Sequence, residues 1–254
     1  MKEILITNDD GFEANGLLEL ADALRSIARV TIVAPSQEKS ACAHSITITK
    51  PLRLIKIADS FYKLDDGTPS DCVFLGLHTL FYNKKPDLII SGINHGANLA
   101  EDITYSGTCG GAIEGVLHGV PSLAVSQYYK TLDNLDFGLA CDVTVDLVKQ
   151  IFEKGYPLGE RKVLNLNIPD VKKSEYKGIK VVEAGRKDYF TDARLHKNPR
   201  GIEYYWLGAM NITFDKEKNK DTDLEAVVDG YASLTPLTLN LTEYSEMNRL
   251  KNWL

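Results

Sequence analysis

Short apolar runs alternate with amphipathic helical patterns through the first half of this chain. The runs typical of buried strands are Ile4–Ile6, Val30–Ala34, Leu88–Ser91 and Ser122–Ser126. Apolar residues at helical spacing cover Leu17–Ile27, Pro69–Phe81 and Gly110–Leu117. Because apolar strands separated by helices are typical of parallel sheets, the pattern predicts a doubly wound α/β fold.

The second half is richer in β patterns. After a long amphipathic helix at Leu135–Phe152 come strand-like stretches at Val163–Ile168, Ile179–Glu183, Glu203–Leu207 and Tyr231–Leu241. Earlier, Ser45–Ile57 alternates like a strand but contains Pro51, which favours an antiparallel excursion at the sheet edge. We expect a single domain over residues 1–254. Its core, with the active site, covers 1–170, followed by a β-rich oligomerisation extension over 171–242 and a C-terminal helix over 243–254.

Composition and charge exclude several classes of protein. The 254 residues, 44% of them hydrophobic, can bury one large core. A net charge of −6 argues against binding a nucleic-acid duplex or an anionic membrane. No stretch approaches the roughly 18 apolar residues of a membrane span, and no signal peptide is evident, so we expect a cytoplasmic protein. The cysteines are too widely spaced for a zinc site and are expected to be reduced: Cys42, Cys72, Cys109 and Cys141.

Two adjacent carboxylates, Asp9 and Asp10, follow the first expected strand (Glu3–Thr7). Ligands of open α/β sheets bind at such strand ends. Gly11 allows a tight turn that aims both side chains at one point, where they suit a hard divalent cation. The alternative is that Asn-Asp-Asp-Gly is simply a turn, because each of these residues is a good turn former.

Two more polar loops follow expected strand ends. Ser40 offers a hydroxyl ligand; the alternative is that its segment is an ordinary surface loop. Asn94 lies in a glycine-rich turn, where asparagine is a common residue for conformational reasons alone. If these loops converge, the ligands are all oxygen atoms, which favours one Mg²⁺ or Mn²⁺ over zinc. The candidate ligands are Asp9, Asp10, Ser40 and Asn94.

A small, glycine-rich run at Tyr105–Ala112 opens onto a helical pattern. Such a helix start presents backbone N–H groups to an anion, and Ser106 and Thr108 add hydroxyl donors. The run is neither a Walker A loop nor G-x-G-x-x-G, and close helix–sheet packing by small residues is the alternative. A cation beside an anion-binding helix start indicates phosphoryl transfer or hydrolysis. A phosphate-monoester hydrolase is the natural inference.

Histidines leave alternatives open. His44 and His95 lie in loops of the expected site and could transfer protons near neutral pH, but loop histidines are also common at surfaces. His118 lies among apolar residues of a helix and is expected to be packed. No Ser-His-Asp or Cys-His arrangement is evident.

Long motifs occur in order along the chain: ILITNDDGFEANG, VAPSQEKSACAHSIT, DGTPSDCV, SGINHGANLAEDITYSGTCGGAIEG, EAGRKDYF, NPRGIEYYWLG and DGYASLTPL. Together they closely resemble the SurE family, the survival-protein nucleotidases, almost end to end. The resemblance implies a Rossmann-like three-layer α/β/α core with a β-rich C-terminal extension used in oligomer contacts, in a homodimer or homotetramer. It also implies a divalent-metal-dependent nucleotidase that releases phosphate from nucleoside 5′- and 3′-monophosphates.

The resemblance also assigns residues. The family's metal ligands fall on the same four candidates, and its phosphate-contacting positions fall on Asn98, Ser106, Gly107 and Thr108. The chain departs from the family at Ala100, where glycine is usual, and at Gly110-Gly111. An alanine with φ > 0 would shift its loop, and each glycine would loosen the helix start by roughly 0.5–1 kcal/mol. We expect these departures to affect specificity rather than chemistry.

The expected mechanism is in-line attack of a metal-activated water on phosphorus. One aspartate, with Asp9 the first candidate, orients or deprotonates that water, and the phosphate-binding residues hold the developing charge. The alternative is a nucleotide-binding regulatory module without turnover. Exposed-looking aromatics predict that the extension joins subunits, although they could instead form a lid over the base: Tyr189, Phe190, Tyr204, Tyr205 and Trp206.

Overall fold

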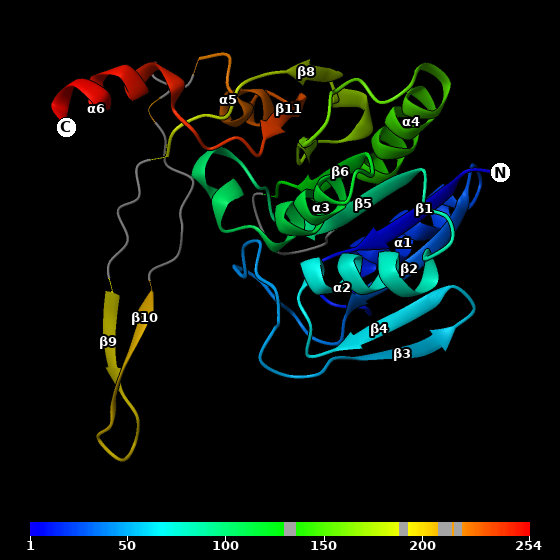
Figure 1. Ribbon diagram of the computed structural model, residues 1–254, viewed down its shortest axis with the longest axis horizontal. Coiled ribbons are helices and arrows are strands. Elements are labelled where there is room, and N and C mark those ends of the chain that lie inside the picture. Colours follow the sequence, from blue (N-terminus) through cyan, green and yellow to red (C-terminus); the bar gives the residue numbers. More distant parts are fainter. Residues whose placement is uncertain (130–135, 188–192, 208–214, 216–219) are drawn as a thin grey trace.

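The computed structural model describes residues 1–129, 136–187, 193–207, 215 and 220–254. Nine strands form its main sheet: β1 (Glu3–Thr7), β2 (Arg29–Pro35), β3 (Arg53–Ala58), β4 (Phe61–Asp65), β5 (Leu88–His95), β6 (Ser122–Gln127), β7 (Lys162–Ile168), β8 (Ile179–Val181) and β11 (Ala232–Thr238). Their spatial order is β3-β4-β2-β1-β5-β6-β7-β11-β8 (Figure 1). A separate antiparallel pair joins β9 (Ala193–Lys197) to β10 (Glu203–Leu207).

The strand order reverses at β1. This strand lies between β2 and β5 and is parallel to both. The chain forms β2 on one side of β1 and later returns to form β5 on the other. Open α/β sheets bind ligands at such a point, outside the carboxyl ends of the strands. There, β1 ends directly before Asn8, Asp9 and Asp10, and β5 ends with Asn94 and His95.

Helices cover both faces of the sheet. On one face lie α1 (Asn15–Leu24) and α4 (Gly138–Lys154), and on the other lie α2 (Pro69–Leu75) and α3 (Gly107–Leu117). Along β1, Ile4 packs in the first of these cores and Leu5 in the second, because successive strand residues point to opposite faces. The predicted three-layer α/β/α core is therefore confirmed.

Helix α2 begins as its sequence indicates. The Thr68 hydroxyl oxygen accepts from the amide of Asp71 at 3.1 Å, and a carboxylate oxygen of Asp71 accepts from the amide of Thr68 at 2.9 Å. Pro69 occupies the start of the helix, where its missing N–H costs nothing. The helix is shorter than expected, because a π-helical turn replaces it over Gly76–Leu80.

Other boundaries also differ from expectation. The expected strand Ser45–Ile57 forms only from Arg53, after Pro51, and the unpredicted strand β4 lies between it and β2. Helix α3 begins at Gly107 rather than Gly110. A further short helix that the sequence did not predict, α5, covers Asp223–Val228.

The C-terminal part is divided between the core and a projection. Strand β11 pairs with β7, and β8 pairs with β11, so both extend the main sheet. The β9–β10 hairpin projects from the body, and all residues of its strands are exposed (Figure 1). Helix α6 (Met247–Trp253) ends the chain and buries no residue. Among the described helices, none has the length and apolar character needed to cross a membrane. Tyr189 and Phe190 lie outside the described residues.

Candidate active site

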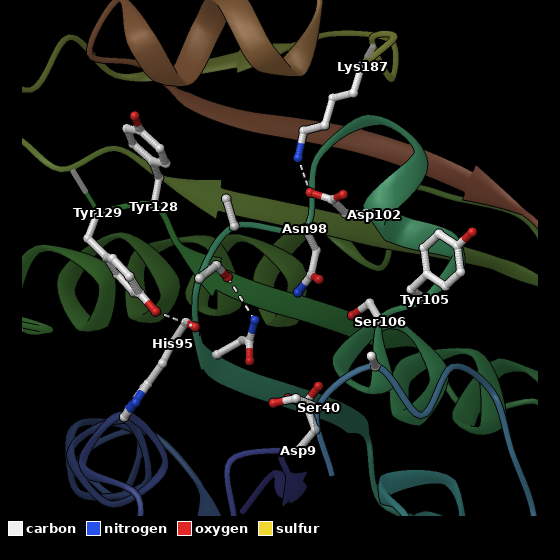
Figure 2. Close-up of a pocket in the computed structure, with 14 residues that line it drawn as sticks. Asp9, Ser40, His95, Asn98, Asp102, Tyr105, Ser106, Tyr128, Tyr129 and Lys187 are labelled. Carbon is white, nitrogen blue, oxygen red and sulfur yellow. Dashed lines mark hydrogen bonds and ion pairs between the residues drawn. The ribbon is translucent and has the colours of Figure 1, made fainter. Parts of the chain in front are cut away.

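A pocket of about 600 Å³ opens at the carboxyl ends of the central strands (Figure 2). It brings together five of the eight residues predicted from the sequence: Asp9, Ser40, Asn94, Asn98 and Ser106. The other three, Asp10, Gly107 and Thr108, are not among its lining residues. The loops after β1, β2 and β5 and the start of α3 thus converge, as the strand-end argument predicts.

Asp9 is held by the first turn of α3. Its side chain is buried, and its Oδ1 accepts from the Thr108 hydroxyl at 2.5 Å while Oδ2 accepts from the Thr108 amide at 3.1 Å. A negative charge at a helix N-terminus is stabilised by the helix dipole and the free N–H groups. Thr108 therefore uses both of its donors on Asp9, and its side chain faces the carboxylate rather than the open pocket.

Asp10 lies against the end of β5. The amide of His95 donates to its Oδ2 at 3.1 Å, and Nδ1 of the His95 ring lies 4.0 Å from its Oδ1. The ring of His95 stacks on Phe137 with centroids 5.0 Å apart. Burial lowers the pKa of His95, so its ring is neutral at physiological pH. His95 also lines the pocket, so its role in proton transfer stays a prediction.

The two adjacent carboxylates fit a bound cation. Burial raises the pKa of Asp9 to about 6, against the stabilising bond from Thr108, and the charge of Asp10 adds to the increase. Burial likewise raises the pKa of Asp10 to about 6, and the charge of Glu38 adds to it. Within the described residues, no lysine or arginine forms an ion pair with either aspartate. Two desolvated carboxylates without a cationic partner are complementary to a divalent metal ion.

The remaining candidate ligands are neutral. The Ser40 hydroxyl donates to Glu38 at 2.7 Å, and Nδ2 of Asn94 donates to the carbonyl of Gly96 at 2.8 Å, so the amide oxygen of Asn94 stays available. Among the described residues, no group of three or more His, Cys, Asp or Glu is placed to hold a metal. A cation here would therefore need neutral oxygen ligands besides the aspartates, which is the donor set that Mg²⁺ and Mn²⁺ accept.

Asn98 is fixed by a polar network with β6 and β7. Its Nδ2 donates to the Ser126 hydroxyl at 2.7 Å, and its amide donates to Oδ1 of Asn167 at 2.7 Å. Its carbonyl accepts from the side chains of Asn165 and Asn167 at 2.9 and 3.2 Å. The side chain of Asn98 is therefore oriented before any ligand arrives. Asn165 and Asn167 were not predicted, because nothing in a strand pattern marks an inward polar residue as a support for a distant loop.

Ser106 forms the N-cap of α3. Its hydroxyl oxygen accepts from the amide of Cys109 at 2.9 Å, which leaves its proton free to donate into the pocket. Close packing around the start of α3 leaves no room for a side chain at two of its glycines. A Cβ on Gly107 would lie 2.9 Å from Oδ2 of Asp9, and one on Gly110 would lie 2.5 Å from the carbonyl oxygen of Ala43.

One cationic residue of the pocket was missed from the sequence. Lys187, in the C-terminal part, lines the pocket and pairs with Asp102, with its side chain 4% exposed (Figure 2). Its amide also donates to Glu101 at 2.9 Å. The buried carboxylate of Asp223 supports this arrangement by accepting from the amides of Ala100 and Gly185, at 2.9 and 2.8 Å. No local pattern could have connected residue 187 to a site near residue 100.

Tyrosines at the end of β6 were also missed. Tyr128 and Tyr129 line the pocket, and the Tyr129 hydroxyl donates to the carbonyl of His95 at 2.6 Å. The strand-end rule used for the other loops could have found them, because they directly follow β6. Ala100, where the family usually has glycine, adopts φ +52°, and the hydrogen bond that its backbone amide donates to the Asp223 carboxylate helps to hold this conformation.

Comparisons with known proteins find relatives of one family. The family model described as "Survival protein SurE" matches residues 4–191. A curated protein from Campylobacter fetus subsp. fetus, named 5′-nucleotidase SurE, is 62% identical over all of both chains. A protein of the same name from Campylobacter jejuni (strain RM1221) is 54% identical, over 100% of this chain and 98% of its own. The crystal structure of the SurE protein from Aquifex aeolicus is 42% identical and covers 99% of each chain, with a TM-score of 0.85.

Proposed function

The chain belongs to the SurE family, and from this premise we propose that it is a 5′-nucleotidase, a phosphate-monoester hydrolase that releases phosphate from nucleoside monophosphates. The observation that carries the proposal is a pair of adjacent desolvated carboxylates after β1: Asp9, which lines the pocket and is bonded to the N-terminus of α3, and Asp10, which lies against the end of β5. An anion-binding helix start next to a cation site is well suited to phosphate-ester hydrolysis.

One divalent cation, Mg²⁺ or Mn²⁺, would be held by Asp9, Asp10, Ser40 and Asn94. When bound, such a cation supplies positive charge to a phosphoryl oxygen and lowers the pKa of a coordinated water. For Ser40 this role requires its hydroxyl oxygen to turn from Glu38 toward the aspartates. That reorientation involves one side-chain torsion of an exposed residue.

The protein's own residues then act on the phosphate and the water. Ser106 donates its free hydroxyl proton, and Asn98 donates its remaining amide N–H, to phosphoryl oxygens. The amide of Gly107 adds the helix-terminal charge, whereas Thr108 acts on the phosphate only if it gives up a bond to Asp9. We propose that Asp9 rather than Asp10 orients the attacking water and accepts its proton, because Asp9 lines the pocket and Asp10 does not.

The same proposal extends to 3′-monophosphates and to assembly. We propose a homodimer or homotetramer in which the exposed β9–β10 hairpin joins subunits, since a lone two-stranded hairpin is at best marginally stable in water.

We also propose a cytoplasmic location. It is supported by four free cysteines, three of them buried, which are typical of a reducing compartment.

The test is phosphate release from adenosine 5′-monophosphate by the purified protein, with and without Mg²⁺ or Mn²⁺, beside the Asp9→Asn variant. We expect metal-dependent release by the wild type and none by the variant. Release of no phosphate by the wild type, together with measurable nucleotide binding, would instead support the regulatory module. Equal turnover by Asp9→Asn would remove Asp9 from the reaction.

A further inference from the structure

The loop that carries Ser40 has an unfavourable backbone conformation. Ala41 and Ala43 have φ of +56° and +52°, in the left-handed region that side chains other than glycine rarely adopt. Ala41 is exposed, so burial of its side chain does not offset the cost of this backbone conformation. Such strain persists only where surrounding contacts enforce it. The question is which contacts hold this loop in place.

The C-terminal end of this loop, at His44, contacts helix α3. Nε2 of His44 lies 2.7 Å from Oε2 of Glu114, which projects from α3 with a side chain only 4% exposed. The other carboxylate oxygen, Oε1, lies 2.9 Å from Nε2 of His118, one helical turn further along α3. Glu114 is thus a buried carboxylate between two imidazoles, and nothing in the proposed reaction uses it.

The charge state of this cluster follows from its geometry. Burial opposes ionisation of Glu114, but the bonds from His44 and His118 outweigh it and lower its pKa. An ionised carboxylate only accepts, so both imidazoles donate through Nε2. Glu114 therefore attracts His44 with a charge-assisted hydrogen bond, which is stronger than a neutral one.

Two backbone contacts complete the attachment. The amide of Ala43 donates to the carbonyl of Tyr105 at 2.9 Å, just before α3 begins. The carbonyl of Ala43 occupies the space left by the absent side chain of Gly110. The same helix holds Asp9 through Thr108. Helix α3 therefore supports two of the proposed metal ligands: Asp9, which follows β1, and Ser40, whose loop follows β2.

We propose that Glu114 is a positioning residue that holds the Ser40 loop through His44, and so places Ser40 within reach of the cation bound by Asp9 and Asp10. The inference rests on the metal site of the proposed function. His44 does not line the pocket, but lines a neighbouring, mostly apolar cavity. It therefore acts through the loop and not on the substrate.

The test uses three variants of the full-length protein. His44→Ala removes the bond to Glu114, His44→Gln keeps a donor for it, and His118→Ala is the matched control that removes the other partner of the same carboxylate without touching the loop. The first readout is Mn²⁺ affinity without substrate, followed by electron paramagnetic resonance. The second is hydrogen exchange over residues 40–44, which needs no metal. The third is turnover of adenosine 5′-monophosphate at saturating Mn²⁺.

We expect His44→Ala to weaken Mn²⁺ binding about tenfold, the effect of one lost hydrogen bond, and to speed exchange in the loop. His44→Gln should restore most of the Mn²⁺ affinity and most of the protection of the loop from exchange, and His118→Ala should match the wild type. Saturating Mn²⁺ should return kcat of His44→Ala to the wild-type value. Wild-type affinity and exchange in His44→Ala would overturn the proposal. So would equal losses in His118→Ala, or a low kcat that Mn²⁺ does not rescue. A wild type that releases no phosphate would refute the proposed function, while the exchange data would still decide whether His44 holds the loop.

Discussion

Thr108 donates two hydrogen bonds to Asp9: its hydroxyl lies 2.5 Å from one carboxylate oxygen, and its backbone amide lies 3.1 Å from the other. The sequence placed Thr108 among residues that hold the phosphate. In the structure its side chain is fully buried against the carboxylate instead. Thr108 therefore sets the direction of Asp9 and lowers its proton affinity, which partly offsets the effect of burial.

Thr108→Val should weaken the metal site while preserving the fold, because valine has the shape of threonine without the hydroxyl. Loss of a hydrogen bond to a charged group costs about 1.5–3 kcal/mol, or roughly 10- to 150-fold in Mn²⁺ affinity. Titration calorimetry measures this, with Thr108→Ser, which keeps the hydroxyl, as the control. A variant with normal Mn²⁺ affinity and only a raised KM would return Thr108 to the phosphate role.

The metal site should be strongly pH dependent. The pKa of Asp10 is about 6 in the folded protein, above the ordinary 3.8, so without metal the folded state binds more protons than the unfolded state between about pH 4 and 6. Its contribution to stability therefore falls as pH rises through that window and stays lower above it. Cation binding requires the ionised form, so its stabilising effect should grow as pH rises through 6.

Thermal unfolding with and without Mn²⁺ checks both signs. We expect a small Mn²⁺-induced rise in Tm near pH 5 and a large one near pH 7.5. Asp10→Asn, which cannot ionise, should be at least as stable as the wild type near pH 7.5 without metal, and should lose most of the Mn²⁺ effect. An Mn²⁺ effect of the same size at both pH values would contradict the assignment of the site to these carboxylates.

The sequence predicted those parts of the site that follow from sheet topology. Asp9, Ser40 and Asn94 each follow or end a parallel strand, and parallel strands present their carboxyl ends along one edge of a sheet. The direction of each side chain was less predictable. Because α3 begins at Gly107 rather than Gly110, Thr108 lies inside its first turn and faces Asp9.

The supporting residues could not be predicted, because they depend on contacts between distant segments. Lys187 reaches the pocket because its segment is tied to the short 3₁₀ helix at Ala100–Thr104 through Asp223. Lys187 lies within the motif EAGRKDYF, but the motif by itself does not indicate a contact with the pocket. The pairing of His44 with Glu114, seventy positions away in the chain, could not be predicted either. Such pairings are properties of the packed fold.

Ser106→Ala and Asn98→Ala should weaken binding of phosphate and of the transition state while leaving metal affinity unchanged. Each removes a donor to a charged group, worth about 1.5–3 kcal/mol in kcat/KM on nucleoside monophosphates. Loss of the N-cap in Ser106→Ala also costs about 1 kcal/mol of stability, which Ser106→Thr should restore. Wild-type kcat/KM in both alanine variants would place the phosphate elsewhere.

Lys187 is the only lysine or arginine among the described lining residues of the pocket, so it should attract the anionic substrate. We expect Lys187→Met to raise KM for nucleoside monophosphates with little change in kcat, and to reduce the salt dependence of kcat/KM. Asp102→Asn, which releases the ammonium group from its partner, should lower KM or leave it unchanged. If both variants raise KM equally, the pair is structural and Lys187 does not attract the substrate.

The β9–β10 hairpin should join subunits. Its strands expose Tyr205 and Trp206 by 62% and 64%, and these neighbours point to opposite faces of the ribbon, so both faces carry aromatic surface. Aromatic residues are enriched at interfaces, and a monomer gains nothing from displaying them on a projecting hairpin. Burial of both faces in an oligomer would also supply the packing that an isolated hairpin lacks.

Sedimentation velocity of the double variant Tyr205→Glu, Trp206→Glu tests this interface against a lid over the base. We expect a smaller species with normal Mn²⁺ affinity, because the aspartates lie in the core and not on the hairpin. Lys197→Ala, on the same hairpin, removes only an exposed ion pair with Glu203 and should leave assembly intact. An unchanged oligomer combined with a large rise in nucleotide KM would instead show that these aromatics close over the bound nucleotide.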